Sequence, residues 1–223
     1  MARPRTIAID GPAGSGKSTI SQQLAERFGY LFVDTGAFYR AITYVVLKEN
    51  IPMAETERII EIAENIQMEI APVAGSDYRV IANGEDVTDH LRSKAVEAHV
   101  SPVSQIPGVR TAILPLQRRV AAQGNIIMAG RDIGTVVLPD ADLKLYIDAS
   151  LRERARRRHE QNTASGKTST QESVEVAMAE RDRIDSERSI APLSRAEDAI
   201  YIMTDERNLG EVIEMICQLI EKH

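Results

Sequence analysis

The stretch Gly11-Pro12-Ala13-Gly14-Ser15-Gly16-Lys17-Ser18 decides the fold class of this 223-residue chain. It fits the phosphate-binding loop pattern G-x-x-x-x-G-K-[ST] at every fixed position. Glycines let backbone N–H groups turn inward around phosphate oxygens, because they lack the Cβ atom that restricts φ and ψ. Lys17 is therefore expected to reach the β- and γ-phosphates of a nucleoside triphosphate, and the Ser18 hydroxyl to bind Mg²⁺.

The residues around this loop support the same interpretation. Residues 6–10 form a short apolar, β-branched run, which predicts a buried strand directly before the loop. After the loop, Ile20, Leu24 and Phe28 recur at helical spacing, and Gly29 offers a helix stop. Strand, loop and helix thus follow in the order that aims a helix N-terminus at phosphates. The alternative, a glycine-rich turn that binds nothing, is disfavoured by this context.

The composition excludes several classes of protein. Hydrophobic residues make up 43% and charged residues 27%, as in a globular domain, and the formal net charge is −6. This acidic balance argues against a nucleic-acid polymer as partner, since such proteins normally present a basic surface. No run approaches the roughly twenty apolar residues of a membrane span, so we expect no membrane partner. A small anion that meets a local basic pocket is the expected substrate.

Cysteine usage bears on the compartment. The single cysteine, Cys217, excludes an intrachain disulfide and fits a reducing cytoplasm, which is the expected location. No signal-peptide apolar stretch follows the basic residues 1–5. Cys217 falls on the apolar face of a helical pattern, so we expect a buried, inert thiol. The four histidines show no metal-ligand spacing.

Strand and helix patterns alternate along the chain. This alternation predicts an α/β fold, a P-loop core with a parallel sheet flanked by helices on both faces. Ligands bind such sheets at the carboxyl ends of the strands. Asp10, Asp34, Asp132 and Asp148 lie at or just after predicted strand ends, which favours a site at that edge. Further strands are predicted at 30–33, 125–129, 143–148 and 199–203, and helices at 36–48 and 55–67.

Two segments interrupt the alternation. Residues 68–87 predict antiparallel strands, with a type I′ turn at Asn83-Gly84. Residues 162–170 are a polar run between two charged helices and predict a mobile loop tip. A βα core with two insertions on the ligand side is typical of a phosphotransferase that closes around its substrates. Two ordinary surface excursions are the alternative.

Arginines are frequent near the predicted strand ends and insertions. Phosphoryl transfer needs positioning and charge neutralisation more than covalent chemistry. A hydroxyl acceptor would require an aspartate base, whereas a phosphate acceptor is mostly ionised at pH 7 and needs none. Arginines then bring the two polyanions together, because a guanidinium binds phosphate with two parallel hydrogen bonds. The candidates are Arg40, Arg110, Arg131, Arg181 and Arg188.

Two further patterns involve arginine. Arg181, Asp185 and Arg188 recur at i, i+4 and i+7, which predicts one face of a helix. The arginines within 152–158 point all round a predicted helix. Most of them are expected to be solvated, with one or two reaching the phosphates of the donor.

Four blocks carry a resemblance to a known family. They are IDGPAGSGK at 9–17, DTGAFYR at 34–40, GRDIGTVV at 130–137 and ERDRIDSER at 180–188. They are collinear over nearly the whole chain and resemble the bacterial cytidylate kinases, and the second and third are far more specific than the loop. The resemblance implies a nucleoside monophosphate kinase fold, with a monophosphate-binding insertion enlarged by a small sheet and with a lid.

The resemblance also implies how the chain is divided. We expect one P-loop kinase domain over 1–223. Its parts are a core at about 1–64, 106–151 and 189–223, a monophosphate-binding insertion at about 65–105 and a lid at about 152–188. The hairpin predicted at 68–87 resembles the small sheet of the family's insertion.

The roles of acceptor-side residues follow from the same resemblance. Arg40 and Arg131 are expected at the acceptor phosphate, with Thr35 close to them. Asp185 and Arg181 are expected to hold the pentose.

The resemblance assigns a second group of residues to the base. Ser101, Arg110 and Asp132 would read the cytosine edge, where the exocyclic amine needs an acceptor and the carbonyl a donor. Arg188 would bridge the base and phosphate parts of the pocket.

Taken together, these observations predict ATP-dependent phosphorylation of CMP and dCMP by direct in-line transfer, with Mg²⁺ bound by Ser18 and the nucleotide phosphates. Lys17, Arg131 and Arg188 are the expected catalytic residues. No long heptad pattern argues for a dimer, so a monomer is the default expectation. The residues expected to bind ATP are Gly11, Pro12, Ala13, Gly14, Ser15, Gly16, Lys17, Ser18 and Thr19.

Other functions remain as alternatives at this point. A related kinase could act on UMP, AMP or a hydroxylated metabolite. A GTPase switch would need N-K-x-D and D-x-x-G motifs, and neither occurs in the sequence. A nucleic-acid-dependent ATPase is disfavoured by the acidic balance.

Overall fold

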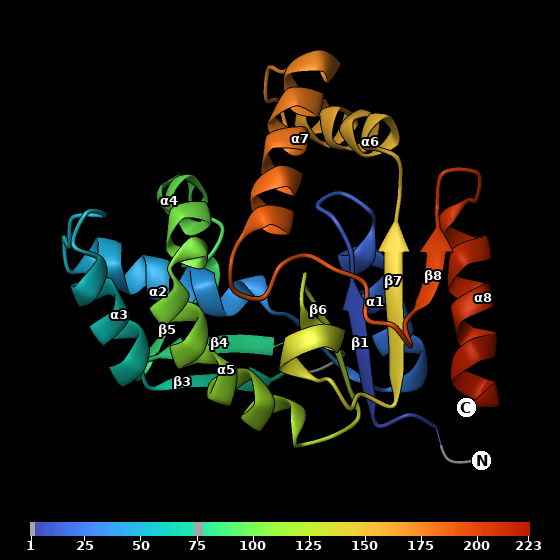
Figure 1. Cartoon of the computed structure of the whole chain (residues 1–223), viewed down its shortest axis with the longest axis horizontal. Helices are drawn as coiled ribbons and strands as arrows, with labels where there is room; N and C mark the ends of the chain where they lie inside the picture. Colours follow the sequence, from blue (N-terminus) through green and yellow to red (C-terminus); the bar gives the residue numbers. More distant parts are fainter. Residues whose placement is uncertain (1–2, 74–77) are drawn as a thin grey trace.

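A five-stranded parallel sheet with the strand order β2-β6-β1-β7-β8 forms the centre of the computed structural model, which describes residues 3–73 and 78–223. The predicted α/β fold is therefore confirmed, and each predicted strand lies within one residue of an observed one. Figure 1 shows β1, β7 and β8 side by side, with their carboxyl ends at the same edge. The strands are β1 (Thr6–Asp10), β2 (Leu31–Asp34), β6 (Ile126–Ala129), β7 (Leu143–Asp148) and β8 (Ile200–Met203).

Alternate residues of β1 face two separate hydrophobic cores. Ile7 and Ile9 pack into a core with α1 (Lys17–Phe28) and α8 (Leu209–Lys222) on one face of the sheet. Ala8 points the other way, into the larger core. A strand buried on both faces needs apolar residues at successive positions, which explains the continuous apolar run at 7–9.

The larger core contains the second helical layer and a small sheet. Its helices are α2 (Gly36–Lys48), α3 (Thr56–Asn65), α4 (Lys94–Gln105) and α5 (Pro107–Ala121). The predicted helix at 36–48 is confirmed, and that at 55–67 is shorter at both ends. A 3₁₀ turn, η1 (Thr88–His90), precedes α4.

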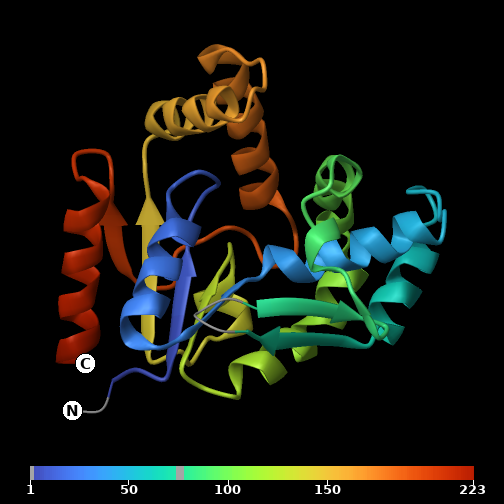
Figure 2. The ribbon, with the colours of Figure 1, turned by 180° about the vertical axis from the view of Figure 1, so that it is seen from behind.

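The predicted antiparallel strands within 68–87 are confirmed, with residues 74–77 lying outside the described residues. They form a three-stranded sheet of β3 (Met68–Pro72), β4 (Tyr78–Ala82) and β5 (Glu85–Asp86). Asn83 and Gly84 both have positive φ, 51° and 81°, as a type I′ turn requires. Figure 2 shows this sheet beside α2, away from the carboxyl ends of the central strands.

Two charged helices, α6 (Leu151–Ala164) and α7 (Gln171–Glu187), form a hairpin above the carboxyl ends of β1 and β7 (Figure 1). The polar loop predicted at 162–170 begins three residues later than expected, because α6 continues through Ala164. The single helix face predicted for residues 181–188 is wrong at its last member. The helix ends at Glu187, and Arg188 follows it in an extended conformation.

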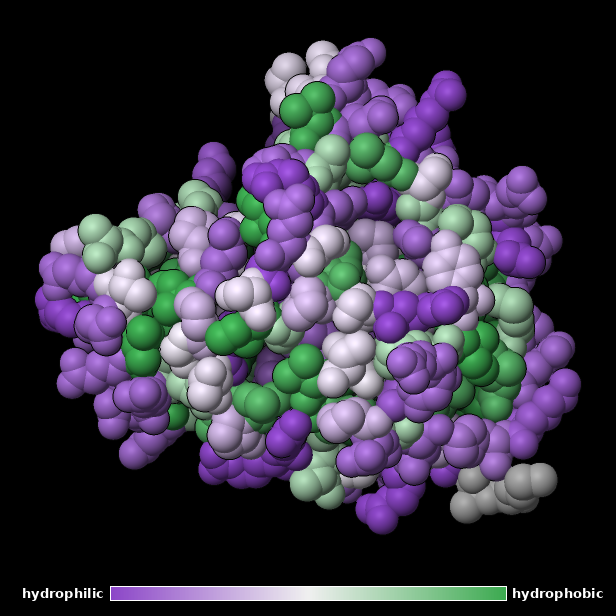
Figure 3. All heavy atoms as spheres, in the orientation of Figure 1, coloured by the Kyte–Doolittle hydropathy of each residue, from purple (hydrophilic) through white to green (hydrophobic). Residues whose placement is uncertain are grey.

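The surface in Figure 3 is mostly hydrophilic, with apolar side chains in small separate groups. No helix in the described ranges 3–73 and 78–223 is both long and apolar enough to cross a membrane.

Candidate active site

A large cleft with a volume of about 1230 Å³ lies at the carboxyl ends of the central strands. The phosphate-binding loop lines one end, and side chains of α2, α4 and α5 line the other. The hairpin of α6 and α7 contributes the upper wall. The cleft thus joins the loop predicted to bind the donor with the arginines predicted to bind the acceptor.

The phosphate-binding loop leads directly into α1, whose first residue is Lys17. Gly11 has a φ of 143°, and a Cβ atom there would lie 2.0 Å from the carbonyl oxygen of Ile147, so only glycine fits. Lys17 is 6% exposed, and its Nζ donates to the Pro12 carbonyl at 2.6 Å and to Ser15 Oγ at 3.2 Å. Burial lowers the pKa of Lys17, and the charge of Arg131 acts in the same direction.

Asp10, the last residue of β1, connects the loop to the opposite side of the cleft. Its two carboxylate oxygens accept hydrogen bonds from the backbone N–H groups of Ile133 (2.8 Å) and Gly134 (2.7 Å). Burial raises the pKa of Asp10 to about 6, although these two hydrogen bonds oppose the shift. The strand before the loop is therefore joined to the turn after Asp132.

That turn is a single π-helical turn, η2 (Ile133–Val137). The N–H of Val137 donates to the Asp132 carbonyl at 3.1 Å, an i to i+5 bond. Arg118 of α5 donates to the carbonyl oxygens of Val136 (2.8 Å) and Val137 (3.0 Å), which stabilises the far end of the turn. Such turns are rare and often occur at functional sites.

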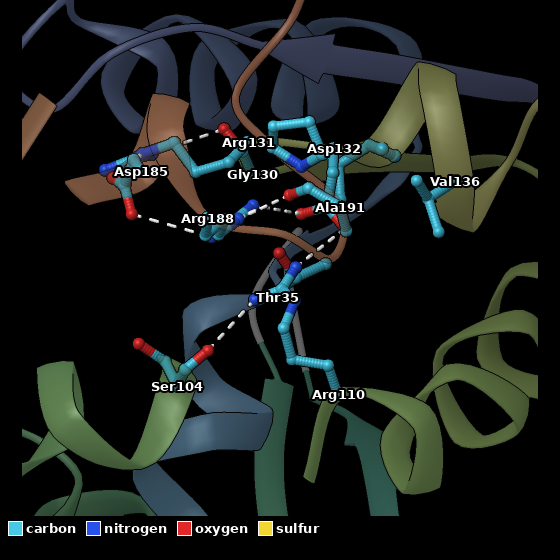
Figure 4. Close-up of polar contacts among 12 residues, drawn as sticks. Thr35, Ser104, Arg110, Gly130, Arg131, Asp132, Val136, Asp185, Arg188 and Ala191 are labelled. Carbon is cyan, nitrogen blue, oxygen red and sulfur yellow. Dashed lines mark hydrogen bonds and ion pairs between the residues drawn. The ribbon is translucent and has the colours of Figure 1, made fainter. Parts of the chain in front are cut away.

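The carboxylate of Asp132 lies between two arginines (Figure 4). Arg110 of α5 donates from Nη2 to Oδ2 at 2.8 Å, and Arg188 donates from Nη2 to Oδ1 at 3.2 Å. All three side chains are at most 11% exposed. Burial lowers the pKa of Arg188, and the positive charge of Arg110 acts in the same direction. The arrangement presents both donors and an acceptor to the cleft.

Asp185 extends this network toward the loop (Figure 4). It accepts a hydrogen bond from Arg131 Nε at 3.0 Å, and its other oxygen lies 3.5 Å from Arg188 Nη1. The chain of charges therefore runs from Arg131 through Asp185, Arg188 and Asp132 to Arg110. Three segments distant in the sequence supply these side chains: α5, residues 131–132 and residues 185–188.

Three more predicted residues lie around the cleft. Arg40 forms an ion pair with Glu97 of α4 at 3.2 Å. Thr35 is buried and donates to the Ala129 carbonyl at 3.0 Å. Ser101 lies on α4 and lines the cleft.

Positive charge accumulates in the middle of the cleft. Burial lowers the pKa of Arg181, and the charge of Arg131 adds to the shift, as does that of Arg40. Guanidinium groups that lower one another's pKa favour an anion between them, because its negative charge offsets their mutual repulsion. The predicted acceptor arginines are therefore brought together around one space.

A family model described as cytidylate kinase matches residues 7–222. The chain belongs to the cytidylate kinase family. A protein described as cytidylate kinase from Exiguobacterium sp. (strain ATCC BAA-1283 / AT1b) is 45% identical over 222 residues, covering 100% of this chain and 99% of that one. Another from Streptococcus pneumoniae (strain 70585) is 43% identical over 216 residues, covering 97% of both chains.

Among solved structures, an uncharacterized protein from Eubacterium ventriosum ATCC 27560 has a TM-score of 0.56 at 13% identity. The match covers 99% of this chain and 100% of that one. At this identity the likeness supports the fold of the cytidylate kinase family member described here and no more.

Most of the arginines within 152–158 of this cytidylate kinase family member are not buried, as expected. Arg152, Arg156 and Arg158 are exposed, as expected for α6. Arg154 is instead 5% exposed; it forms an ion pair with Asp182 at 2.7 Å and donates to the Ala13 carbonyl at 3.1 Å. It therefore joins the helical hairpin to the phosphate-binding loop.

The sequence reasoning also missed several residues that line the cleft of this cytidylate kinase family member. Tyr39 lies under the Arg110 guanidinium, with 5.2 Å between its ring centroid and Cζ. The carbonyl of Ser104 accepts a hydrogen bond from Arg110 Nη1 at 3.2 Å. Arg92 lies on the wall of the cleft, 3.9 Å from Asp34. The one sequence signal that could have identified Tyr39 is its position beside Arg40 in the block 34–40.

Proposed function

We propose that this protein transfers the γ-phosphoryl group of ATP to CMP or dCMP, giving ADP and CDP or dCDP. One observation carries the proposal. The carboxylate of Asp132, held between Arg110 and Arg188, lies in the same cleft as the phosphate-binding loop. Membership in the cytidylate kinase family supports the same conclusion.

The donor half of the site is the loop and the start of α1. ATP would bind residues 11–19, with backbone N–H groups and the N-terminus of α1 directed at its phosphates. Lys17 already points into the loop, where it bonds to Pro12. Its ammonium would move onto the β- and γ-phosphates, whose negative charges would stabilise its charged form.

The acceptor half would read the base through Asp132. Cytosine offers an exocyclic amine, for which Asp132 is the acceptor, and a carbonyl oxygen, for which Arg110 is a donor. Uracil has a carbonyl in place of the amine and would bring its oxygen against the carboxylate. Ser101 would complete this edge, and Arg188 would hold Asp132 from its other oxygen.

The pentose and phosphate of the acceptor would lie between the base reader and the loop. Asp185 and Arg181 would bind the pentose hydroxyl groups. Arg40 and Arg131 would bind the phosphate, with Thr35 beside them. Arg40 would leave its exposed partner Glu97 for this purpose, which costs little because that ion pair is partly solvated.

The chemistry requires no general base. An oxygen of the ionised acceptor phosphate attacks the γ-phosphorus, and the bond from that phosphorus to the bridging oxygen breaks, so that ADP leaves. Negative charge on the transferring group would be stabilised by Lys17, Arg131 and Arg188, which we propose as the catalytic residues. The protein would therefore act by placing the two polyanions, ATP and the acceptor nucleotide, in line for transfer.

A magnesium ion would fit this site. Ser18 is exposed to the cleft at the start of α1. The described residues include no cluster of three or more histidine, cysteine or acidic side chains that could hold a metal. Mg²⁺ commonly keeps several waters and takes few protein oxygens besides substrate phosphates, and the Ser18 hydroxyl would be one of them. When bound, the ion would neutralise charge on the donor phosphates.

Closure would complete the site. Residues 65–105 and 152–188 are proposed as a monophosphate-binding insertion and a lid that close on the core and exclude water. The remaining segments, 1–64, 106–151 and 189–223, would form the core. We propose a cytoplasmic monomer, in keeping with the buried free thiol of Cys217.

A panel of acceptors tests the proposal. ADP release is measured with ATP, Mg²⁺ and each of CMP, dCMP, UMP and AMP. We expect kcat/KM for CMP and dCMP to exceed the value for UMP by at least about tenfold, and AMP to be inactive. Preferential use of UMP or AMP, or activity on none of the four, would overturn the proposal.

A further inference from the structure

The Arg110 guanidinium is not fully held by hydrogen bonds. Its role in base recognition rests on the proposed function. Nη2 donates to Asp132 and Nη1 to the Ser104 carbonyl (Figure 4). Arg110 Nε is buried and has no hydrogen-bond partner among the described residues. Two hydrogen bonds at the tip of a long side chain do not fix how the guanidinium plane is rotated about the side-chain axis. Other contacts must fix this rotation.

The missing constraint is an aromatic face. The ring of Tyr39, a residue of α2, lies 5.2 Å from Arg110 Cζ, and the two residues are 8% and 7% exposed. A cation over an aromatic ring is attracted by the negative face of the π system, and the attraction grows when both groups are desolvated. A planar guanidinium also packs on a ring in a restricted orientation.

The positive charge around Asp132 makes the contact between Tyr39 and Arg110 more important. Arg188 shares the carboxylate of Asp132 with Arg110, so two guanidiniums are held around a single negative charge. Asp185 partly neutralises Arg188 on its other side, with 3.5 Å between Asp185 Oδ1 and Arg188 Nη1. The ring of Tyr39 is the corresponding electron-rich neighbour of Arg110.

The phenol suits this role over the whole physiological pH range. Burial raises the pKa of Tyr39, although the charge of Arg110 and a hydrogen bond between the Tyr39 and Arg110 side chains oppose the shift, so its hydroxyl stays neutral. The ring therefore provides a constant neutral surface and does not compete with Asp132 for the positive charge of Arg110.

We propose that Tyr39 is a positioning residue for base discrimination: its ring holds the Arg110 guanidinium in the place from which it meets both Asp132 and the pyrimidine. Tyr39 acts through Arg110 and does not take part in the transfer. Loss of the ring lets the guanidinium turn. The fixed pairing of donor and acceptor, which separates cytosine from uracil, is then weakened.

The test compares two variants of the same residue. Tyr39→Phe keeps the ring and Tyr39→Leu removes it. The quantity measured is kcat/KM for CMP divided by kcat/KM for UMP. We expect Tyr39→Leu to lower this ratio about tenfold, with KM for ATP unchanged, and Tyr39→Phe to restore most of it. An unchanged ratio in Tyr39→Leu overturns the inference, and so does an equal loss in Tyr39→Phe, which would assign the effect to the hydroxyl.

A matched control lies on the same helix. Tyr44 also has a cation near its ring, Lys48 Nζ at 5.8 Å, and it stacks on His90, outside the cleft. Tyr44→Leu should leave the CMP/UMP ratio unchanged. If Tyr44→Leu lowers the ratio as much as Tyr39→Leu, general loosening of α2 is the cause and the inference fails.

A double-variant cycle shows whether Tyr39 acts through Arg110. In an Arg110→Ala background, Tyr39→Leu should have no further effect on the CMP/UMP ratio. A full additional loss there would contradict the inference. If Tyr39→Leu does not fold, as judged by thermal unfolding, Tyr39→Met takes its place, because it fills a similar volume without a ring.

These results are separable from the proposed function. A wild-type protein that does not prefer CMP to UMP contradicts the proposed function before any variant is made. A wild-type protein that does, with an unchanged ratio in Tyr39→Leu, contradicts only the role of Tyr39.

Discussion

Gly134 donates its backbone N–H to Oδ2 of Asp10 at 2.7 Å, across the boundary between the two halves of the cleft. Asp10 belongs to the strand that carries the phosphate-binding loop, and Gly134 to the turn that follows Asp132. Together with the bond from Ile133, this hydrogen bond joins that turn directly to the end of β1, next to the start of the loop.

The pH dependence of stability should reveal this buried carboxyl group. The pKa of Asp10 is raised from 3.8 to about 6, so between these values the folded protein binds a proton that the unfolded chain has lost. Stability contributed by this group is complete below pH 3.8 and is lost as the pH rises through 6, by about 3 kcal/mol. Asp10→Asn has no such proton to lose. Urea unfolding from pH 4 to 7 should show Asp10→Asn gaining on the wild type as the pH rises.

Asp142 provides the opposite case at the other end of β1. Burial acts to raise its pKa, but the hydrogen bonds from Thr6 and Arg5 outweigh it and lower the pKa. Stability from Asp142 is thus lost as the pH falls below 3.8, so Asp142→Asn should lose ground to the wild type as the pH rises toward 3.8 and should run parallel to it from pH 4 to 7. Parallel pH curves for wild type and Asp10→Asn would contradict the raised pKa.

Replacing the loop lysine should abolish transfer while the fold survives. Lys17→Ala removes a buried charge that the free protein holds at a cost, so the free energy of unfolding should not fall. The transition state loses its cation, and kcat should drop on the order of 10²–10⁴-fold. Lys48→Ala, at an exposed lysine paired with Glu85, should keep wild-type kcat. A folded Lys17→Ala enzyme with nearly full kcat would refute the role of Lys17.

Replacing the base reader should affect the acceptor far more than the donor. Asp132→Asn leaves Arg110 buried without its counterion, leaves Arg188 with only Asp185, and turns one acceptor oxygen into an amide donor. We expect kcat/KM for CMP to fall about 10²–10³-fold, with a smaller loss for UMP. KM for ATP should change less than about threefold. Equal losses in CMP use and ATP binding would argue for general damage to the cleft.

The ion pair between Arg154 of α6 and Asp182 of α7, the two helices of the hairpin, should be a strong one. Arg154→Met leaves Asp182 without its partner, and one Asp182 oxygen is already buried without a hydrogen bond in the described structure. The free energy of unfolding should fall by about 2–4 kcal/mol, as measured by urea denaturation. Arg183→Met, on the exposed side of α7, should change it by less than about 0.5 kcal/mol. A second substitution, Asp182→Leu, should recover much of the loss in Arg154→Met.

The central sheet was predictable because its signals are local. The apolar run at 6–10, the glycines after it and the periodic residues of α1 lie within 25 residues, and no distant contact is needed to interpret them. The gathering of Asp10, Asp34, Asp132 and Asp148 at one edge then follows from parallel strand geometry.

Other elements depend on contacts that no local pattern contains. Helices α4 and α5 contain Pro102 and Pro115, which obscure the helical signal in the sequence. Arg154 is one of five arginines in seven residues, and only the fold identifies the one that meets Asp182. The π turn after Asp132 is held by Asp10 and Arg118, both distant in the sequence.

The central position of β1 has a consequence for how the protein is made. Thr6 pairs with Ile126 and Ile7 pairs with Leu143, so both neighbours of the first strand are synthesised long after it. Such distant pairings slow folding, and an apolar strand that lacks its neighbours is prone to aggregate. On the ribosome, the phosphate-binding motif therefore emerges before both strands that pair with β1, and Gly11 lacks its close neighbour, the Ile147 carbonyl of β7, until that strand follows. We expect a chain arrested before that point to carry the whole motif and to bind nucleotide poorly.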